Sequence, residues 1–204
     1  MLRDWHHWIG TFTGVVATTM AALPLAALAV SALACRRTAT GSTPAWAWRM
    51  SLAEVGIVYG TVPWVWMILL PGNRAGTSLV PLRDLLTILT DRGPVTLMGQ
   101  VVGNLMVFAA LGFLAPLRFA ALASVSRIVA LAAGCSILVE AAQYVLRLDR
   151  VSSVDDVLLN AAGAGLAALA SRRWWRAAAR ASAPSAIEGS PTVGSCTGDG
   201  GRAT

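Results

Sequence analysis

Residues 153–171 read Ser-Val-Asp-Asp-Val-Leu-Leu-Asn-Ala-Ala-Gly-Ala-Gly-Leu-Ala-Ala-Leu-Ala-Ser, an apolar run of helical length with two acids near its start. A run of about 18 or more apolar residues with few charges is typical of a membrane-spanning helix. The small residues around Gly163 and Gly165 give it a smooth face, against which another helix backbone can pack closely. This stretch therefore predicts a transmembrane helix with tightly packed neighbours.

Further apolar runs precede this one along the chain. We expect them to span the membrane at about Ile9–Ala34, Met50–Leu70, Val95–Leu117 and Ser124–Leu146. The first run is longer than the apolar core of a signal peptide, which has about 7–15 residues, so we expect it to be retained. The pairs Gly56/Gly60 and Gly99/Gly103 predict two more close helix contacts. The expected fold class is all-α: a polytopic membrane helix bundle of about five transmembrane helices.

The composition of the whole chain also indicates a membrane protein. Of the 204 residues, 56% are hydrophobic and 13% are charged, and the mean hydropathy is +0.64. Because a typical soluble domain carries about 25% charged residues, this composition argues against a soluble enzyme and against a disordered chain. The net charge is +6. The charges separate apolar runs and do not form one soluble basic face, so we expect membrane lipids and no nucleic acid as partners.

The arginines predict how the bundle is oriented. If the spans alternate in direction and Arg202 in the tail is set aside, nine arginines fall on one side of the membrane and six on the other. The larger set includes Arg172, Arg173 and Arg176. Because arginine is enriched in cytoplasmic loops, we expect that side to be the cytoplasm. The sequence therefore predicts a multi-pass protein of the cell membrane, with its N-terminus outside and its C-terminus in the cytoplasm.

Three regions are expected along the chain. Residues 1–49 would form an extra N-terminal span with a cytoplasmic loop, and residues 50–171 the main membrane domain. Residues 172–204 would form a basic juxtamembrane segment and a tail, whose Gly, Ser, Pro and Thr content predicts disorder. In the long loop from Pro71 to Pro94, the apolar spacing after Pro81 predicts an amphipathic helix on the outer surface. Such a helix could cover polar residues that lie below it.

Polar side chains at membrane depth gather toward the predicted outer side. Asn104 lies about nine residues into its span, or roughly 14 Å at about 1.5 Å per residue. Glu140 and Gln143 share one helical face, and Asp156 and Asn160 share another. Polar groups in lipid are costly and by default mark a functional site or a structural pair. We therefore predict a ligand-binding set of Asn104, Glu140, Gln143, Arg147, Arg150, Asp156 and Asn160.

Each of these residues also has a structural interpretation. Glu140 could form an ion pair with Arg147 or Arg150, and the two arginines could anchor lipid headgroups. The carboxamides could be hydrogen bonds between helices, and acids at the start of a helix favour its dipole in any case. Outside the set, Glu54 is expected to be interfacial or to pair with Arg49.

No metal site and no cofactor is expected. The cysteines form no C-x-x-C motif and have no histidine near them in sequence. His6 and His7 are interpreted as solvated histidines at the membrane interface.

Several motifs resemble the VanZ-like family of bacterial integral membrane proteins. They cover about Met50 to Ser171, and their order and spacing carry the resemblance. They are Ser78-Leu79-Val80-Pro81-Leu82, Asn104-Leu105-Met106-Val107-Phe108, Leu111-Gly112-Phe113, Glu140-Ala141-Ala142-Gln143, Arg150, and Asp155-Asp156-Val157-Leu158-Leu159-Asn160 with Gly163. The resemblance implies a four-helix membrane core with a cytoplasmic C-terminus, to which this chain adds one N-terminal span.

The resemblance also implies a role in the cell envelope. The namesake of the family is linked to low-level resistance to the glycopeptide teicoplanin, by a mechanism that is not established. We therefore expect an outward-facing polar pocket that binds an envelope lipid or a glycopeptide. The alternative is an intramembrane enzyme acting on a lipid-linked envelope precursor, with Glu140 as general acid or base and Asp156 as a second carboxylate. The sequence leaves open whether the protein is an enzyme, and it leaves the oligomeric state open.

Overall fold

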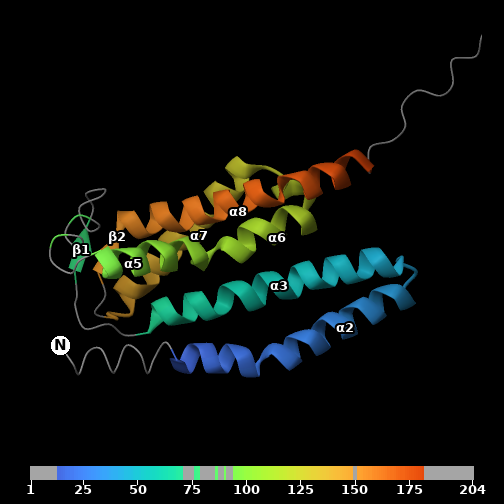
Figure 1. Ribbon diagram of the computed structural model, residues 1–204, viewed down its shortest axis with the longest axis horizontal. Helices are drawn as coiled ribbons and strands as arrows, with labels where there is room; N and C mark the ends of the chain where they lie inside the picture. Colours follow the sequence, from blue (N-terminus) through green and yellow to red (C-terminus); the bar gives the residue numbers. More distant parts are fainter. Residues whose placement is uncertain are drawn as a thin grey trace, which may run out of the picture.

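The computed structural model describes residues 13–70, 76–78, 86, 90, 94–148 and 151–181. Within these ranges, five helices are long and apolar enough to cross a membrane. They are Thr13–Ala39, Pro44–Leu69, Thr96–Arg118, Val125–Val145 and Val154–Ala177. The predicted all-α membrane bundle is therefore confirmed, and Figure 1 shows its helices lying alongside one another.

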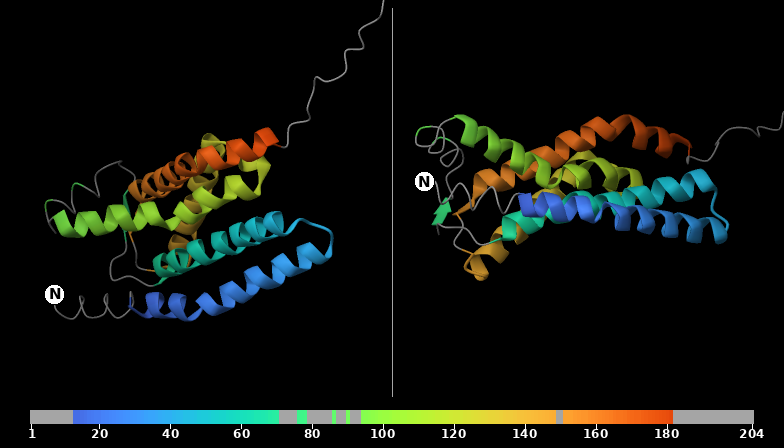
Figure 2. Two further views of the ribbon diagram at one scale, coloured as in Figure 1. Left: turned by 45° about the vertical axis from the view of Figure 1, so that its right-hand side comes forward. Right: turned by 60° about the horizontal axis from the view of Figure 1, so that its bottom comes forward.

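The first two spans form an antiparallel hairpin at one side of the bundle, as Figures 1 and 2 show. It consists of α2 (Leu23–Ala39) and α3 (Pro44–Leu69). The first span is interrupted by a turn at Ala22, because Pro24 has no N–H for the preceding helical turn and its ring crowds that turn. Gly41 lies in the connection between α2 and α3 at φ 94°, a left-handed conformation that glycine adopts without strain.

The remaining helices pack around α8, which contacts α5, α6 and α7. The elements are α5 (Pro94–Val107), α6 (Ala109–Arg118), the 3-10 helix η1 (Ala120–Leu122), α7 (Val125–Val145) and α8 (Val154–Ala181). The sequence predicts α5 and α6 as one straight helix, whereas the helix is interrupted at the buried Phe108. This interruption lets α5 and α6 both pack against α8.

Helix α8 meets α5 and α6 backbone to backbone. A Cβ atom placed on Gly163 would lie 2.1 Å from the carbonyl oxygen of Leu105 in α5. A Cβ atom on Gly112 of α6 would lie 2.2 Å from the carbonyl oxygen of Ala164. No side chain fits at either position, so both glycines are required for this contact. The smooth face predicted on the last span is therefore a true packing face.

The two G-x-x-x-G pairs behave differently. A Cβ on Gly60 of α3 would lie 2.5 Å from the Cβ of Ala110 in α6, and Gly56 is similarly close to Leu114. This pair is the predicted packing face. At Gly99 and Gly103 of α5, by contrast, an added Cβ would meet nothing within 4 Å among the described residues. The predicted close contact at the second pair is therefore wrong for the part of the chain that the structure describes.

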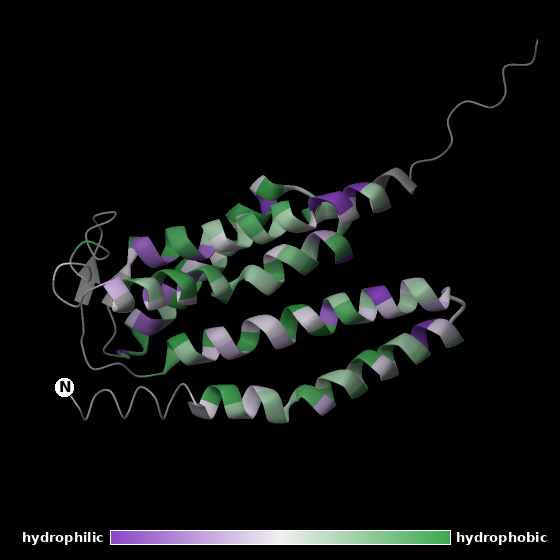
Figure 3. Ribbon diagram, in the orientation of Figure 1, coloured by the Kyte–Doolittle hydropathy of each residue, from purple (hydrophilic) through white to green (hydrophobic). Residues whose placement is uncertain are grey.

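Helix α8 extends beyond the predicted end of its span at Ser171 and continues to Ala181. In this extension the Trp175 side chain is buried, and its indole N–H donates to the carbonyl of Ala168 at 3.4 Å. Arg173 and Arg176 lie over the rings of Trp174 and Trp175. Figure 3 shows hydrophilic residues gathered toward the ends of the bundle, with apolar residues between them.

An ion cluster joins the N-terminal hairpin to the rest of the bundle. Glu54 of α3 accepts a hydrogen bond from Arg37 of α2 at 2.5 Å through Oε2, and one from Arg118 of α6 through Oε1. Arg37 also donates to Ser51 at 2.6 Å. The predicted partner of Glu54, Arg49, is therefore wrong, because arginines from two other helices occupy both carboxylate oxygens.

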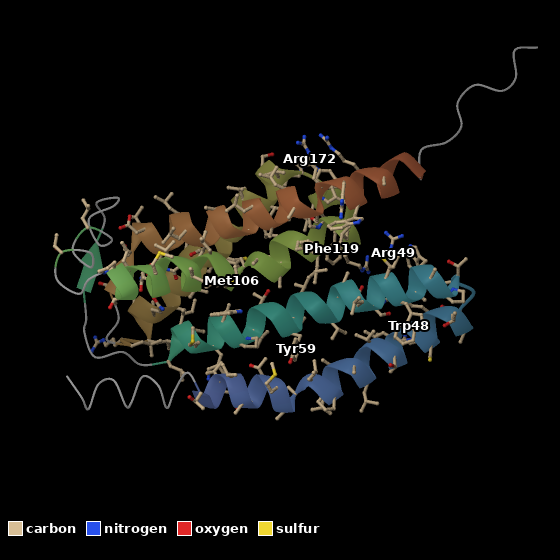
Figure 4. All side chains as sticks on the ribbon, in the orientation of Figure 1. Trp48, Arg49, Tyr59, Met106, Phe119 and Arg172 are labelled. Carbon is tan, nitrogen blue, oxygen red and sulfur yellow. The ribbon has the colours of Figure 1, made fainter. Side chains whose placement is uncertain are left out.

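A second contact ties the hairpin together toward the opposite end. The hydroxyl of Tyr59 donates to the carbonyl of Thr19 at 2.7 Å, and Figure 4 shows Tyr59 on the side of α3 that faces α2.

At the end of the bundle where α5 and α8 begin, two short strands pair. They are β1 (Gly76–Ser78) and β2 (Val151–Ser153). The strands are parallel, with Ser78 opposite Ser153. The loop between the second and third spans is thereby attached to the start of α8. Of the amphipathic helix predicted after Pro81 in that loop, the described residues are Leu86 and Thr90, each in helical conformation. The rest of that helix and the predicted disordered tail beyond Ala181 lie outside the described residues.

The glycine contact at α8 yields a stability prediction. We expect Gly163→Ala to lower the free energy of unfolding by about 1–3 kcal/mol, because the methyl group must push α8 away from Leu105. Gly103→Ala is the matched control, since its methyl group enters open space. Thermal unfolding of both purified variants in detergent measures the difference. Equal midpoints for the two variants would contradict the packing described here.

Candidate functional site

The centre of the polar region is Asp156, the third residue of α8. Its Oδ1 atom accepts a hydrogen bond from Nε2 of Gln100 at 2.9 Å and one from Nδ2 of Asn104 at 2.5 Å. Gln100 and Asn104 are four residues apart in α5, so their side chains share one helical face. Two carboxamides on one helix thus hold a carboxylate on another, and the structure joins the predicted residues Asn104 and Asp156.

One turn further along α8, Asn160 bonds to α7. Its Nδ2 atom lies 2.8 Å from the hydroxyl oxygen of Ser136, and both side chains are buried. Within the described part of the chain, the buried Oδ1 atom of Asn160 has no hydrogen-bond partner. Asn160 therefore ties α8 to α7 through its nitrogen and leaves an acceptor in the interior.

Gln143 of α7 bonds to α3. Its Nε2 atom donates to the carbonyl of Ile68 at 2.6 Å. Ile68 lies in the last turn of α3, where backbone carbonyls have no partner within the helix. Gln143 thus satisfies a carbonyl that has no partner within its own helix. Its own Oε1 atom is buried and has no hydrogen-bond partner among the residues that the structure describes.

The pairing of α7 with α8 determines how far along the bundle Glu140 lies relative to Asp156. The two helices are consecutive and antiparallel, and Ser136 lies opposite Asn160. One turn along α7 leads to Glu140, and one turn back along α8 leads to Asp156, so the two acids lie at about the same level. Both side chains are half-buried. Glu140 and Asp156 therefore lie at about the same depth along the bundle on two neighbouring helices.

The predicted arginines lie at the rim of this region or beyond the described chain. Arg147 follows the last turn of α7, is exposed, and has φ 51°. The N–H of Leu148 bonds to the carbonyl of Gln143 at 3.1 Å and that of Arg147 to the carbonyl of Tyr144 at 3.2 Å, a Schellman arrangement that ends the helix. Arg150 lies outside the described residues.

The start of α8 is held by a cap. The hydroxyl oxygen of Ser153 accepts a hydrogen bond from the backbone N–H of Asp155 at 3.2 Å, as an N-cap residue does. Ser153 is also the last residue of β2, so the same residue joins the strand pair to the helix that carries Asp156. The segment at Gly76–Ser78 is thereby fixed beside the beginning of α8.

Two residues of the region were not in the predicted set. Gln100 precedes Asn104 by one turn, and Ser136 precedes Glu140 by one turn. In each case the signal was a further polar residue four positions earlier on a face already recognised as polar. The acceptor for Gln143 could not be predicted in this way, because it is a backbone carbonyl.

The chemistry of the region is that of carboxylates and carboxamides. Among the described residues, no group of three or more His, Cys, Asp or Glu side chains is arranged to hold a metal ion. The groups present can bind hydrogen-bond donors or cations, and two carboxylates at one level could exchange a proton with a ligand between them.

Comparison with known proteins identifies one match. A family model described as VanZ/LLP1 matches residues 57–176, which is more than half of the chain. The matched range includes α5 to α7, most of α8, and the residues that surround Asp156; it does not include α2. No curated protein and no solved structure matches the chain.

The hydrogen bonds predict which residues are energetically coupled. In a double-mutant cycle, we expect Asn104→Ala and Asp156→Ala to show a coupling of about 0.6–1.7 kcal/mol, the range for hydrogen bonds between membrane helices. The matched cycle pairs Gln143→Ala with Asp156→Ala and should give a coupling near zero, because the Gln143 amide bonds to Ile68. Unfolding in bicelles measures both. Zero coupling in the first cycle would show that Asn104 does not hold Asp156.

Proposed function

Because the chain belongs to the VanZ/LLP1 family, we propose that it acts in the cell envelope as a multi-pass membrane protein with an outward-facing polar pocket around Asp156. The pocket would bind an envelope amphiphile, either a lipid or a glycopeptide of the teicoplanin type. Its lining would include Asn104, Glu140, Gln143, Arg147, Arg150, Asp156 and Asn160, with Gln100 as an addition from the structure.

The observation that carries this proposal is the pair of hydrogen bonds from Gln100 and Asn104 to one oxygen of Asp156. A charged side chain within a membrane helix costs several kcal/mol unless it is stabilised, and such residues commonly mark ligand or ion sites. Apolar contact through Gly163 already packs α5 against α8. The contact between α5 and α8 therefore does not require a carboxylate held by two donors. This supports a binding role for Asp156.

The outward direction of the pocket rests on the arginines. Arg172, Arg173 and Arg176 lie in the C-terminal part of α8, at the end opposite Asp156. Arg118 is likewise at the far end of α6. Since clusters of arginine favour the cytoplasmic side, Asp156 would lie toward the outer leaflet. The loop segment attached to the start of α8 would then lie over the pocket on the outside.

The type of ligand follows from the surroundings of the pocket. Large apolar side chains of α5, among them Met98 and Val102, are exposed on the face of the helix opposite Gln100 and Asn104, where lipid tails would lie. Arg147, exposed at the rim, suits an anionic group. An envelope lipid, or a glycopeptide with an acyl chain, would offer its polar head to the cluster and keep its apolar tail in the surrounding bilayer.

An enzyme is the second candidate, and the equal level of Glu140 and Asp156 favours it. Two carboxylates on facing helices could act as general acid and general base on a lipid-linked envelope precursor. Glu140 would take the acid or base role, and Asp156, fixed by its two carboxamides, would be the second carboxylate.

Complementation of a deletion strain tests the proposal. We expect the wild-type gene to restore teicoplanin tolerance and the envelope lipid profile, and Asp156→Asn and Glu140→Gln to fail, because each keeps the shape and removes the charge. Arg127→Gln is the control: this exposed arginine lies at the opposite end of α7 and should complement fully. Immunoblots of membranes establish equal protein levels.

The outcomes separate the alternatives. Full complementation by both carboxylate variants would exclude the pocket and the enzyme together and leave a structural network. If both variants fail, accumulation of an unprocessed lipid precursor in the deletion strain would favour the enzyme. If the deletion strain loses teicoplanin tolerance but accumulates no lipid precursor, the binding protein would be favoured.

A further inference from the structure

The C-terminal part of α8 carries three exposed arginines, Arg172, Arg173 and Arg176. Figure 4 shows Arg172 at the outer edge of the bundle. None of the three guanidinium groups is paired with a carboxylate among the residues that the structure describes. Like charges four residues apart on a helix repel one another, as Arg172 and Arg176 do. The cluster is therefore more stable beside an anion.

The rest of this end of the bundle supplies no such anion within the described ranges. Glu54 is the one acid described there, and arginines of α2 and α6 already occupy both of its oxygens. Three further exposed arginines add to the positive charge: Arg36 of α2, Arg49 of α3 and Arg127 of α7. The partner of the α8 arginines is therefore expected to come from outside the described chain.

An apolar stripe leads along α8 to these arginines. Leu158, Leu166 and Leu169 are exposed. At about 3.6 residues per turn, the three leucines and the three arginines fall on one face of the helix, about 120° wide. Gly163 and Ala164, which meet α5 and α6, lie on the opposite face. In a bundle that spans a membrane, the exposed leucine face contacts acyl chains, and the arginines are at its end.

Aromatic contacts place the arginines at the level of lipid headgroups. Trp174 is exposed, and its ring lies 5.5 Å from the ring of Phe113. The guanidinium of Arg173 lies 4.3 Å from the centre of the Trp174 ring. Tryptophan is enriched where the hydrocarbon core meets the headgroups. Stacking holds the guanidinium by its face, so the N–H groups at its edge remain available to a phosphate.

From this arrangement we propose that the C-terminal part of α8 binds an anionic phospholipid. The lipid phosphate accepts hydrogen bonds from the arginines, since the guanidinium fork matches a phosphate in a bidentate manner. One acyl chain lies along the leucines. Half of a hydrocarbon core is about 15 Å thick, which corresponds to about ten residues of helix. A chain that begins at Arg172 thus passes Leu169 and Leu166.

The position of the leucines favours a lipid over a soluble anion. A soluble anion would use the arginines alone, whereas a phospholipid uses the arginines and the apolar stripe together. This site lies at the opposite end of α8 from Asp156, so it is separate from the proposed pocket and does not depend on it.

The first test compares headgroups on the purified full-length protein. We expect short-chain phosphatidylglycerol to stabilise it against thermal unfolding at about one-tenth of the concentration required for phosphatidylcholine of the same chain length, because basic residues near a membrane surface attract anionic lipids. Inorganic phosphate at the same concentration should not stabilise it. Equal effects of the two lipids, or equal effects of phosphatidylglycerol and phosphate, would overturn the proposal.

Paired variants separate a site from general attraction by charge. The double variant Arg172→Gln/Arg173→Gln should reduce the preference for phosphatidylglycerol toward unity. The control Arg36→Gln/Arg49→Gln removes the same charge from the same end of the bundle and should retain the preference. An equal loss in both double variants would contradict a site on α8, because the lipid would then respond only to the net charge of this end.

Cross-linking locates the lipid without any variant, so it decides the question even if the α8 variant does not fold. Phosphatidylglycerol with a photoreactive acyl chain should label peptides that contain Leu166 and Leu169 more strongly than the matching phosphatidylcholine probe does. Mass spectrometry of the digested protein measures this difference. Equal labelling of these peptides by the two probes would overturn the proposal.

Discussion

The close backbone contact of α8 with α5 and α6 determines where the polar side chains of α8, Asp156 and Asn160, lie in the bundle. Gly163 meets the carbonyl of Leu105, and Gly112 meets the carbonyl of Ala164, with no room for a side chain at either glycine. In a bilayer, helices gain little from hydrophobic burial against one another, so such close packing is a principal source of their association. With α8 held in this way, Asp156 reaches Gln100 and Asn104 on α5. On its other side, Asn160 reaches Ser136 of α7.

Among the residues that the structure describes, charged side chains lie toward the two ends of the bundle, and the two ends differ in chemistry. At one end Glu54 is surrounded by arginines from α2 and α6, which supply both a positive charge and donors. This ion cluster fastens the N-terminal hairpin to the helices that match the family model, since Arg118 lies inside the matched range and Arg37 lies outside it. At the other end Asp156 is held by neutral carboxamides, and acceptor oxygens remain on α7 and α8. The first end is a satisfied structural network, and the second is where we propose the binding pocket.

The sequence predicted the helices well and the contacts between them only in part. Length and hydropathy were sufficient for the five spans, because a membrane requires about 20 apolar residues whatever the packing. Spacing along one helix correctly placed Gly56 with Gly60 on a packing face, but the same motif at Gly99 and Gly103 faces open space. A motif on one helix does not show which neighbouring helix it contacts. The interruption of the helix at Phe108 is not marked by a proline or glycine at that position. The sequence predicts Asn104 and Asp156 near one another because both lie toward the same side of the membrane. The bonds from Gln143 to Ile68 and from Glu54 to Arg37 depend on tertiary packing, which the spacing along one helix does not show.

In the proposed orientation, Asp156 and Glu140 face the outside of the cell and Glu54 faces the cytoplasm. A membrane-impermeant carbodiimide with a labelled amine tests it directly, because this reagent modifies only carboxylates accessible from its own side. All three side chains are partly exposed, and peptide mapping by mass spectrometry distinguishes them. Labelling of Asp156 and Glu140 in intact spheroplasts, and of Glu54 in inside-out vesicles only, is the result that this account predicts. Labelling of Glu54 from the outside, or no labelling of Asp156 from either side, would contradict it.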